Sequence, residues 1–255
     1  MLRRMLTGLL TSVVLVGASL AMPATGAHAQ TLTPYSAGVT QTVSDSMVWA
    51  NFGVAAPAVT PGDYASSAEI LVKGGPTGTD SVAIGWTVNL SLNGDSNPHL
   101  FVYWTKAGVG QCYNAGCPGY TAYPGATFTA GQALTAGTAQ RFRLLHDGGA
   151  WWFWAGNTAG TGEYFGYIND SNWGTAWPTF STVQAFGQVT VAAAAPTTRM
   201  GNGTCADNPS ALTIGSLAYN TATVNPTAFA TDSNKYSVTM LSARTMRYGG
   251  DGSCP

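Results

Sequence analysis

Short runs in which apolar residues alternate with small or polar ones recur along this chain and constrain its fold more than any other feature. From about Tyr64 onward Gly, Pro and Asn separate the runs, which include AEILVK, SVAIGWTV, HLFVYWTK, RFRLLHD, WWFWAGN, VQAFGQVTV and KYSVTML. A period of two is typical of strands that bury one face. Because no stretch keeps a helical period, the sequence predicts an all-β protein, an antiparallel β-sandwich rather than βαβ units.

One pair of runs predicts a β-hairpin. In LLHDGGAWWFWAGN, two apolar runs flank Asp147-Gly148-Gly149. Trp152 and Trp154 would lie on one face of the second strand, and Trp151 and Phe153 on the other. Two interpretations stay open: both faces belong to the core or the sheet surface, or Trp152 helps to form an aromatic wall for a substrate ring or sugar.

The N-terminus has the pattern of a cleavable signal peptide. Arg3 and Arg4 supply positive charge, an apolar stretch follows, and Ala-His-Ala before Gln30 fits a small-residue cleavage site. The alternative is a membrane anchor, although Thr, Gly and Ser dilute the apolar run. We expect a signal peptide at residues 1–29, cleavage after Ala29, and a secreted or periplasmic mature protein.

The mature chain is expected to have two parts. Residues 30–62, rich in Ser, Thr, Ala, Val and Pro, predict an N-terminal arm with one strand around Ser46–Phe52, and residues 63–255 predict one β-sandwich domain. The chain has 10 Lys and Arg, two of them in the signal peptide, against 11 Asp and Glu. A slightly negative mature protein argues against nucleic-acid and anionic-membrane partners.

Four cysteines in an exported chain favour two disulfides. Cys112 and Cys117 lie close together in CYNAGC and would close a tight loop. Cys205 would then pair with Cys254 and tie the C-terminus to the body. The other pairings stay open on sequence alone.

The common catalytic motifs are missing from the sequence. It contains no G-x-S-x-G, H-E-x-x-H, Walker A or strand-linked G-x-G-x-x-G motif. His146 precedes Asp147, but adjacent residues do not make a triad, so we interpret His146 as a strand-end residue and His99 as the start of a strand. Neither histidine lies near a cysteine, and we expect no metal or cofactor. The chain has two glutamates, Glu69 and Glu163, so a mechanism that needs two glutamates must use both.

Five segments between about Tyr64 and Tyr219 share an order with a known family. They are SVAIGWTVNLSLNGDSNPHLFVYWTKAG, QCYNAGCPGY, AWWFW…GEYFGYINDSNW, VQAFGQV and TTRMGNG. In this order they resemble the neprosin family of secreted glutamic peptidases. The resemblance implies a sandwich of two bent antiparallel sheets with a concave cleft, a pair of catalytic glutamates in that cleft, and cleavage after proline. One glutamate would act as general base and the other, protonated, would polarise the scissile carbonyl.

Both catalytic positions are substituted in this chain. The first family glutamate stands two residues before the G-W pair, where this sequence has Ala83, and the second stands at Gln188. Alanine exchanges no proton, and glutamine forms hydrogen bonds but does not titrate. The resemblance therefore implies a degenerate member that keeps a binding cleft, for which the candidate lining residues are Trp86, Tyr103, Trp104 and Trp152.

One carboxylate is a candidate replacement. Glu69 stands where relatives tend to carry glutamine, and pairing of its strand with the Ala83 strand would place it opposite about Gly85, on the same side. With Gln188 it would form a Gln/Glu dyad, as in another glutamic peptidase family. The other interpretation is a surface or structural role for Glu69, and Glu163 is interpreted as a loop residue.

Two functions follow from these residues. The leading hypothesis is a secreted, catalytically degenerate domain that binds an extended or Pro-rich peptide, or a glycan. The alternative is an active acid endopeptidase that cuts after proline with Glu69 and Gln188 or another carboxylate. A lectin-like module is a third hypothesis that rests on the tryptophans alone.

Overall fold

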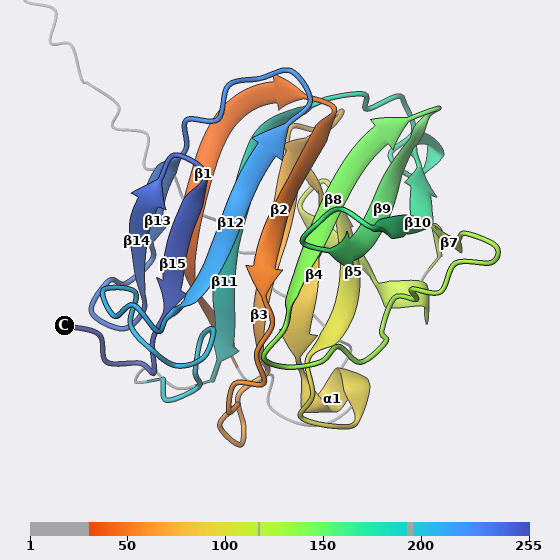
Figure 1. Ribbon diagram of the computed structural model, residues 1–255. Helices are drawn as coiled ribbons and strands as arrows, with labels where there is room; N and C mark the ends of the chain where they lie inside the picture. Colours follow the sequence, from red (N-terminus) through yellow and green to blue (C-terminus); the bar gives the residue numbers. More distant parts are fainter. Residues whose placement is uncertain (1–30, 117, 193–195) are drawn as a thin grey trace, which may run out of the picture.

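The computed structural model describes residues 31–116, 118–192 and 196–255, which form two antiparallel sheets packed face to face (Figure 1). This arrangement confirms the predicted all-β sandwich. The predicted signal peptide and Cys117, one partner of the predicted Cys112–Cys117 disulfide, lie outside the described residues. No helix in the described part of the chain has the length and apolar character needed to cross a membrane.

The first sheet has seven strands among the described residues. In spatial order they are β13 (Thr227–Ala230), β1 (Thr33–Asp45), β11 (Phe180–Val191), β3 (Ala65–Gly74), β4 (Asp80–Val88), β5 (His99–Lys106) and β6 (Val109–Tyr113). We call it sheet A.

The second sheet, sheet B, has eight strands among the described residues. In spatial order they are β14 (Ser237–Ser242), β15 (Thr245–Gly249), β12 (Leu212–Tyr219), β2 (Met47–Gly53), β8 (Ala139–Asp147), β9 (Ala150–Asn157), β10 (Gly162–Asn169) and β7 (Tyr120–Ala122). Three short helical turns complete the fold: α1 (Leu90–Asn93), η1 (Asn114–Gly116) and η2 (Asp170–Asn172).

The predicted hairpin forms between β8 and β9. Asp147 pairs with Ala150, and both residues between them have positive φ, 57° at Gly148 and 80° at Gly149. A two-residue turn with positive φ at both positions is a type I′ turn, whose twist matches that of the flanking strands. The sequence Asp-Gly-Gly-Ala thus fixes the register of this hairpin.

In the segment predicted as an N-terminal arm, the described residues form two strands, β1 and β2, and β2 matches the strand expected around Ser46–Phe52. β1 pairs with β11 and β13 inside sheet A, and β2 pairs with β12 and β8 inside sheet B. The chain passes between the sheets at Asp45, whose buried carboxylate accepts backbone hydrogen bonds from Ser46 and Met47, which follow it, and from residues 220–222. The sequence pattern missed β1 because its residues are mostly small and hydroxylated, and their strand conformation depends on pairing with β11.

The hydrophobic core lies between the sheets. Its largest fully buried side chains include Trp86 from sheet A and Trp151, Phe52 and Phe142 from sheet B. The disulfide between Cys205 and Cys254 ties the C-terminal segment to the loop before β12, which confirms the predicted long-range pair.

Candidate functional site

The outer face of sheet A, which is turned away from the core, carries the residues that the sequence singled out. Along β4, Val82, Ile84 and Trp86 belong to the main core cluster. Ala83 instead belongs to a separate small cluster with Phe101 and Tyr103, with Leu71 and Tyr113 packed against it. The predicted alternation of β4 is therefore correct, and its small-residue side is the outer face.

Glu69 lies on this outer face, at the predicted position. It pairs with Gly85 across β3 and β4 and with Phe186 across β3 and β11. Because directly opposed residues of antiparallel strands point to the same side, all three share the outer face. The hairpin register predicted from sequence is confirmed.

β3 lies between the two strands that carry the substituted positions. Ala83 on β4 pairs with Leu71, and Gln188 on β11 pairs with Ser67. Glu69 is midway between Leu71 and Ser67 on β3, so it is the diagonal neighbour of both Ala83 and Gln188. Diagonal cross-strand neighbours have Cα atoms about 7–8 Å apart, within reach of long side chains. The register thus brings Glu69 and Gln188 to neighbouring positions.

The pKa of Glu69 is raised to about 8. The main cause is burial, which disfavours the charged carboxylate, and the positive charge of Lys73 on the same strand opposes it only partly. Lys73 in turn has a lowered pKa, caused by burial and opposed by Glu69. Glu69 is half-buried, and in this environment it is a neutral carboxylic acid below about pH 8.

Tyrosines surround this acid on the β5–β6 side. Phe101 and Tyr113 stack with ring centroids 5.3 Å apart, and Tyr103 lies 5.9 Å from Tyr113. The pKa of Tyr103 is raised to about 12, first by burial and then by the nearby charge of Glu69. Its hydroxyl is buried and has no hydrogen-bond partner among the described residues. The cluster is therefore a small buried apolar group beside the glutamic acid, with Leu71 and Tyr113 partly exposed on it.

Gln188 is held by hydroxyl groups on both sides. Its Oε1 accepts a hydrogen bond from Ser36 Oγ on β1 at 3.3 Å, and its Nε2 donates to Thr190 Oγ1 at 3.4 Å. Gln184 and Phe186 share its face, and both are buried. The sequence analysis did not single out these two residues, although the period of two along β11 places them on the same side as Gln188.

Trp86 and Trp104 were expected to line the cleft, and this expectation is wrong. Trp86 has 0% exposure and donates its indole N–H to the Gly53 carbonyl of sheet B at 2.9 Å. Trp104 is 5% exposed and packs edge-on against Trp173. Both have the opposite strand parity to Ala83, so they point into the core. Of the predicted residues on sheet A, Tyr103 is the aromatic one that shares the face of Ala83.

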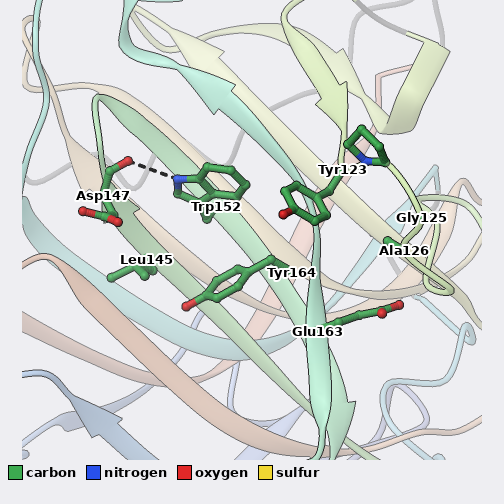
Figure 2. Close-up of a pocket in the computed structure, with 9 residues that line it drawn as sticks. Tyr123, Gly125, Ala126, Leu145, Asp147, Trp152, Glu163 and Tyr164 are labelled. Atoms are coloured by element: carbon green, nitrogen blue, oxygen red, sulfur yellow. Dashed lines mark hydrogen bonds between the residues drawn. The ribbon is translucent and has the colours of Figure 1, made fainter.

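Trp152 lies on the other sheet. It belongs to β9, and it points outward from sheet B, where it lines a pocket of about 360 Å³ (Figure 2). Trp151 and Phe153 on the same strand point into the core, as the hairpin pattern predicted. The core separates Trp152 from Glu69, so the two residues cannot form one site.

His99 and His146 have structural partners. His146 is the second-last residue of β8, and its Nε2 lies 3.0 Å from a carboxylate oxygen of Asp170, not of the adjacent Asp147. His99 begins β5, as predicted, and its Nε2 lies 2.9 Å from Asp95. Among the described residues, no group of three or more His, Cys, Asp and Glu side chains is arranged to hold a metal ion.

The outer face of sheet A carries hydrogen-bonding groups but no evident general base. Glu69 is the only acidic residue among the strand positions whose register faces outward here. As a neutral acid it donates a proton in a hydrogen bond, and Gln188 and Gln184 offer both donors and acceptors. The two-glutamate mechanism that the resemblance implies needs one ionised and one protonated carboxyl group at the same pH.

Comparison with known proteins identifies the family. The family model described as Neprosin matches residues 62–251. Among solved structures, scytalido-glutamic peptidase with a peptide-based transition-state analogue is 14% identical with a TM-score of 0.48, covering 87% of this chain and 100% of that one. SCP-B, an eqolisin-family peptidase in complex with the tripeptide Ala-Ile-His, is 12% identical with a TM-score of 0.47 and the same coverage. Because the family model spans well over half of the chain, this protein belongs to the neprosin family.

Proposed function

We propose that this protein is an exported neprosin-family domain that binds an extended peptide on the outer face of sheet A and does not hydrolyse it at acid pH. The observation that carries this proposal is the absence of an ionised carboxyl group at the expected catalytic positions on this face. Ala83 and Gln188 occupy the positions that the resemblance assigns to catalytic glutamates, and Glu69 between them is neutral below about pH 8. At acid pH no carboxylate on this face is ionised to activate a water molecule.

The face retains features that suit a peptide. The half-buried Glu69 and Gln188 provide hydrogen-bonding groups for backbone amides and carbonyls. Leu71 and Tyr113, the partly buried side chains packed on the buried cluster of Ala83, Phe101 and Tyr103, provide an apolar surface on which a proline ring would bury area without requiring a hydrogen bond. A Pro-containing peptide is therefore the first ligand to test.

The test combines binding with digestion. Mature protein is incubated at about pH 4 with an unfolded Pro-containing substrate, beside the Ala83→Glu/Gln188→Glu double variant, and the products are analysed by mass spectrometry. We expect no cleavage by the native sequence and cleavage after proline by the double variant. Calorimetric titration with a Pro-rich peptide should show binding to the native protein, and its absence would contradict the proposal.

A second candidate is an endopeptidase that uses Glu69 and Gln188. The observation in its favour is the register that makes them diagonal neighbours on one face. With a pKa of about 8 at Glu69, such an enzyme would gain activity as the pH rises through 8, because only ionised Glu69 could act as base. Cleavage that increases toward alkaline pH and disappears in Glu69→Gln would establish this candidate. Cleavage at acid pH by the native protein would refute both forms of the proposal.

Export is part of the proposal. The basic, apolar and small-residue pattern of residues 1–29 supports it, and a disulfide between Cys205 and Cys254 suits an oxidising compartment. N-terminal sequencing of protein recovered from the medium or periplasm should begin at Gln30. An uncleaved N-terminus in the membrane fraction would favour the anchor instead.

A further inference from the structure

The pocket on the outer face of sheet B is built largely from aromatic rings. Trp152 of β9, Tyr164 of β10 and Tyr123 after β7 surround the same space (Figure 2). The rings of Tyr123 and Tyr164 stand at 66° and 74° to the plane of Trp152, with centroids 5.9 and 6.0 Å from it. Tyr167 supports Trp152 at 4.6 Å. The rings of Tyr123 and Tyr164, nearly perpendicular to the Trp152 indole, thus form aromatic walls of the pocket.

The indole N–H of Trp152 is already occupied. It donates to the backbone carbonyl of Asp147 at 3.0 Å. What Trp152 offers to a ligand is therefore its π face, whose quadrupole attracts positive charge. The same face of sheet B already holds one such contact, because the guanidinium of Arg143 lies 4.9 Å from the ring centre of neighbouring Trp154.

The charge of the pocket is negative. The lining includes the carboxyl groups of Asp147 and Glu163 and no Lys, Arg or His. Figure 2 shows these two carboxyl groups at opposite ends of the aromatic group. Glu163 accepts hydrogen bonds at one oxygen from the backbone N–H and hydroxyl of Thr127 and the N–H of Phe128, which lower its pKa. The pocket thus combines aromatic walls with an ionised end.

We propose that this pocket binds an organic ammonium cation, in which a positively charged nitrogen lies against the face of Trp152 and its charge is balanced by Asp147 and Glu163. Perpendicular aromatic walls with nearby carboxylates are the arrangement that attracts ammonium groups. A neutral apolar ligand would fill the pocket but would gain no electrostatic attraction from the two carboxylates. The site lies on the sheet opposite Glu69, and its occupation does not depend on the function proposed for sheet A.

The first test uses the native protein and two probes of the same shape. Choline is titrated beside 3,3-dimethylbutan-1-ol, in which carbon replaces the charged nitrogen, and binding is followed by calorimetry and by the indole N–H signals in NMR spectra. We expect choline to bind about tenfold more tightly than the neutral probe. Equal affinity for the two probes would overturn the proposal, and so would tighter binding of methyl β-glucoside than of choline.

The second test locates the site. Trp152→Leu should weaken choline binding about tenfold and Asp147→Asn about threefold. Trp49→Leu is the matched control, because Trp49 is on the same sheet beside Arg141, outside the pocket, and its affinity for choline should equal that of the native protein. Unchanged binding in a folded Trp152→Leu variant would overturn the proposal.

A third probe distinguishes the source of the cation. Nα-acetyl-lysine methylamide represents a polypeptide side chain, whereas choline represents a quaternary headgroup. Tighter binding of the lysine derivative would assign the site to a basic segment of a polypeptide, and tighter binding of choline to a quaternary ammonium compound. Binding of neither probe to the native protein would refute the site.

Discussion

The two glutamates of this chain lie on opposite sheets, Glu69 on β3 and Glu163 on β10, and differ in nearly every physical respect. Glu69 on sheet A is half-buried, and burial raises its pKa to about 8. Glu163 on sheet B accepts three hydrogen bonds from Thr127 and Phe128, which lower its pKa. The difference shows that desolvation and hydrogen bonding, rather than residue type, decide whether a carboxyl group is charged.

The neighbourhoods of the two glutamates differ accordingly. Around Glu69 the strands offer amides, hydroxyls and a small apolar cluster, which suit the neutral backbone of a peptide. Around Glu163 the pocket offers aromatic faces and a second carboxyl group from Asp147, which suit a cation. The two faces are therefore expected to bind ligands of different chemistry and to respond to pH in opposite directions.

The largest effect on stability is expected from replacing Trp86, which is buried in the core between the two sheets. Trp86→Ala removes a fully buried indole from the core and should lower the free energy of unfolding by about 3–5 kcal/mol. Trp152→Ala, on the outer face of sheet B, should cost about 1 kcal/mol or less. Chemical denaturation of the two variants measures this difference. A small effect of Trp86→Ala would mean that β4 has the opposite orientation.

A smaller effect is expected at Glu69. Between its ordinary pKa of 4.5 and its raised pKa of about 8, the folded state keeps a proton that the unfolded state has lost, so stability falls as the pH rises. Glu69→Gln removes this dependence. Because Glu69 is partly exposed, we expect a modest effect. As the pH rises from acid to alkaline, the free energy of unfolding of the variant should increase by about 1–2 kcal/mol relative to that of the native protein. Melting temperatures of the native protein and of Glu69→Gln, measured across this pH range, test the prediction. The same pH dependence in both proteins would contradict the raised pKa of Glu69.

The hairpin turn offers a change confined to sheet B. Gly149 has a φ of 80° and no neighbouring atom near the position of an added Cβ, so Gly149→Ala adds only backbone strain, about 1 kcal/mol. Because this turn positions Asp147 and Trp152, cation binding should weaken while peptide binding on sheet A stays unchanged. Chemical denaturation measures the loss of stability, and titrations with choline and with a Pro-rich peptide measure binding at the two faces. An equal loss at both faces would show that they are coupled.

The smallest effect is expected at Glu163, and its sign is opposite to that at Glu69. A carboxyl group whose pKa is lowered on folding stabilises the folded state above its unfolded pKa, and this contribution is lost as the pH falls through the folded pKa. Glu163→Gln should therefore lower the melting temperature at neutral pH, and the gap to the native protein should close toward acid pH. A gap that widens on acidification would contradict the hydrogen-bonding pattern at Thr127 and Phe128.

Local sequence patterns were sufficient for the sandwich class and for much of the site. The period of two predicted many of the strands, Asp147-Gly148-Gly149 predicted the hairpin, and the expected pairing of the Glu69 strand with the Ala83 strand placed Glu69 opposite Gly85. The same alternation also contained the information that Trp86 and Ala83 point to opposite sides. The expectation that Trp86 lines a cleft was wrong because Trp86 shares the strand parity of Val82 and Ile84, whose side chains pack in the core.

What the sequence determined by itself is the strand character of the alternating segments, the faces of their residues and the β8–β9 turn, because these depend on spacing along one strand or between neighbouring strands. Only the tertiary structure decided that β1 and β2 belong to different sheets, that Trp152 lies on the sheet opposite Glu69, and that burial keeps Glu69 protonated. Those properties depend on contacts between residues far apart in the chain, and a local pattern carries no information about such contacts.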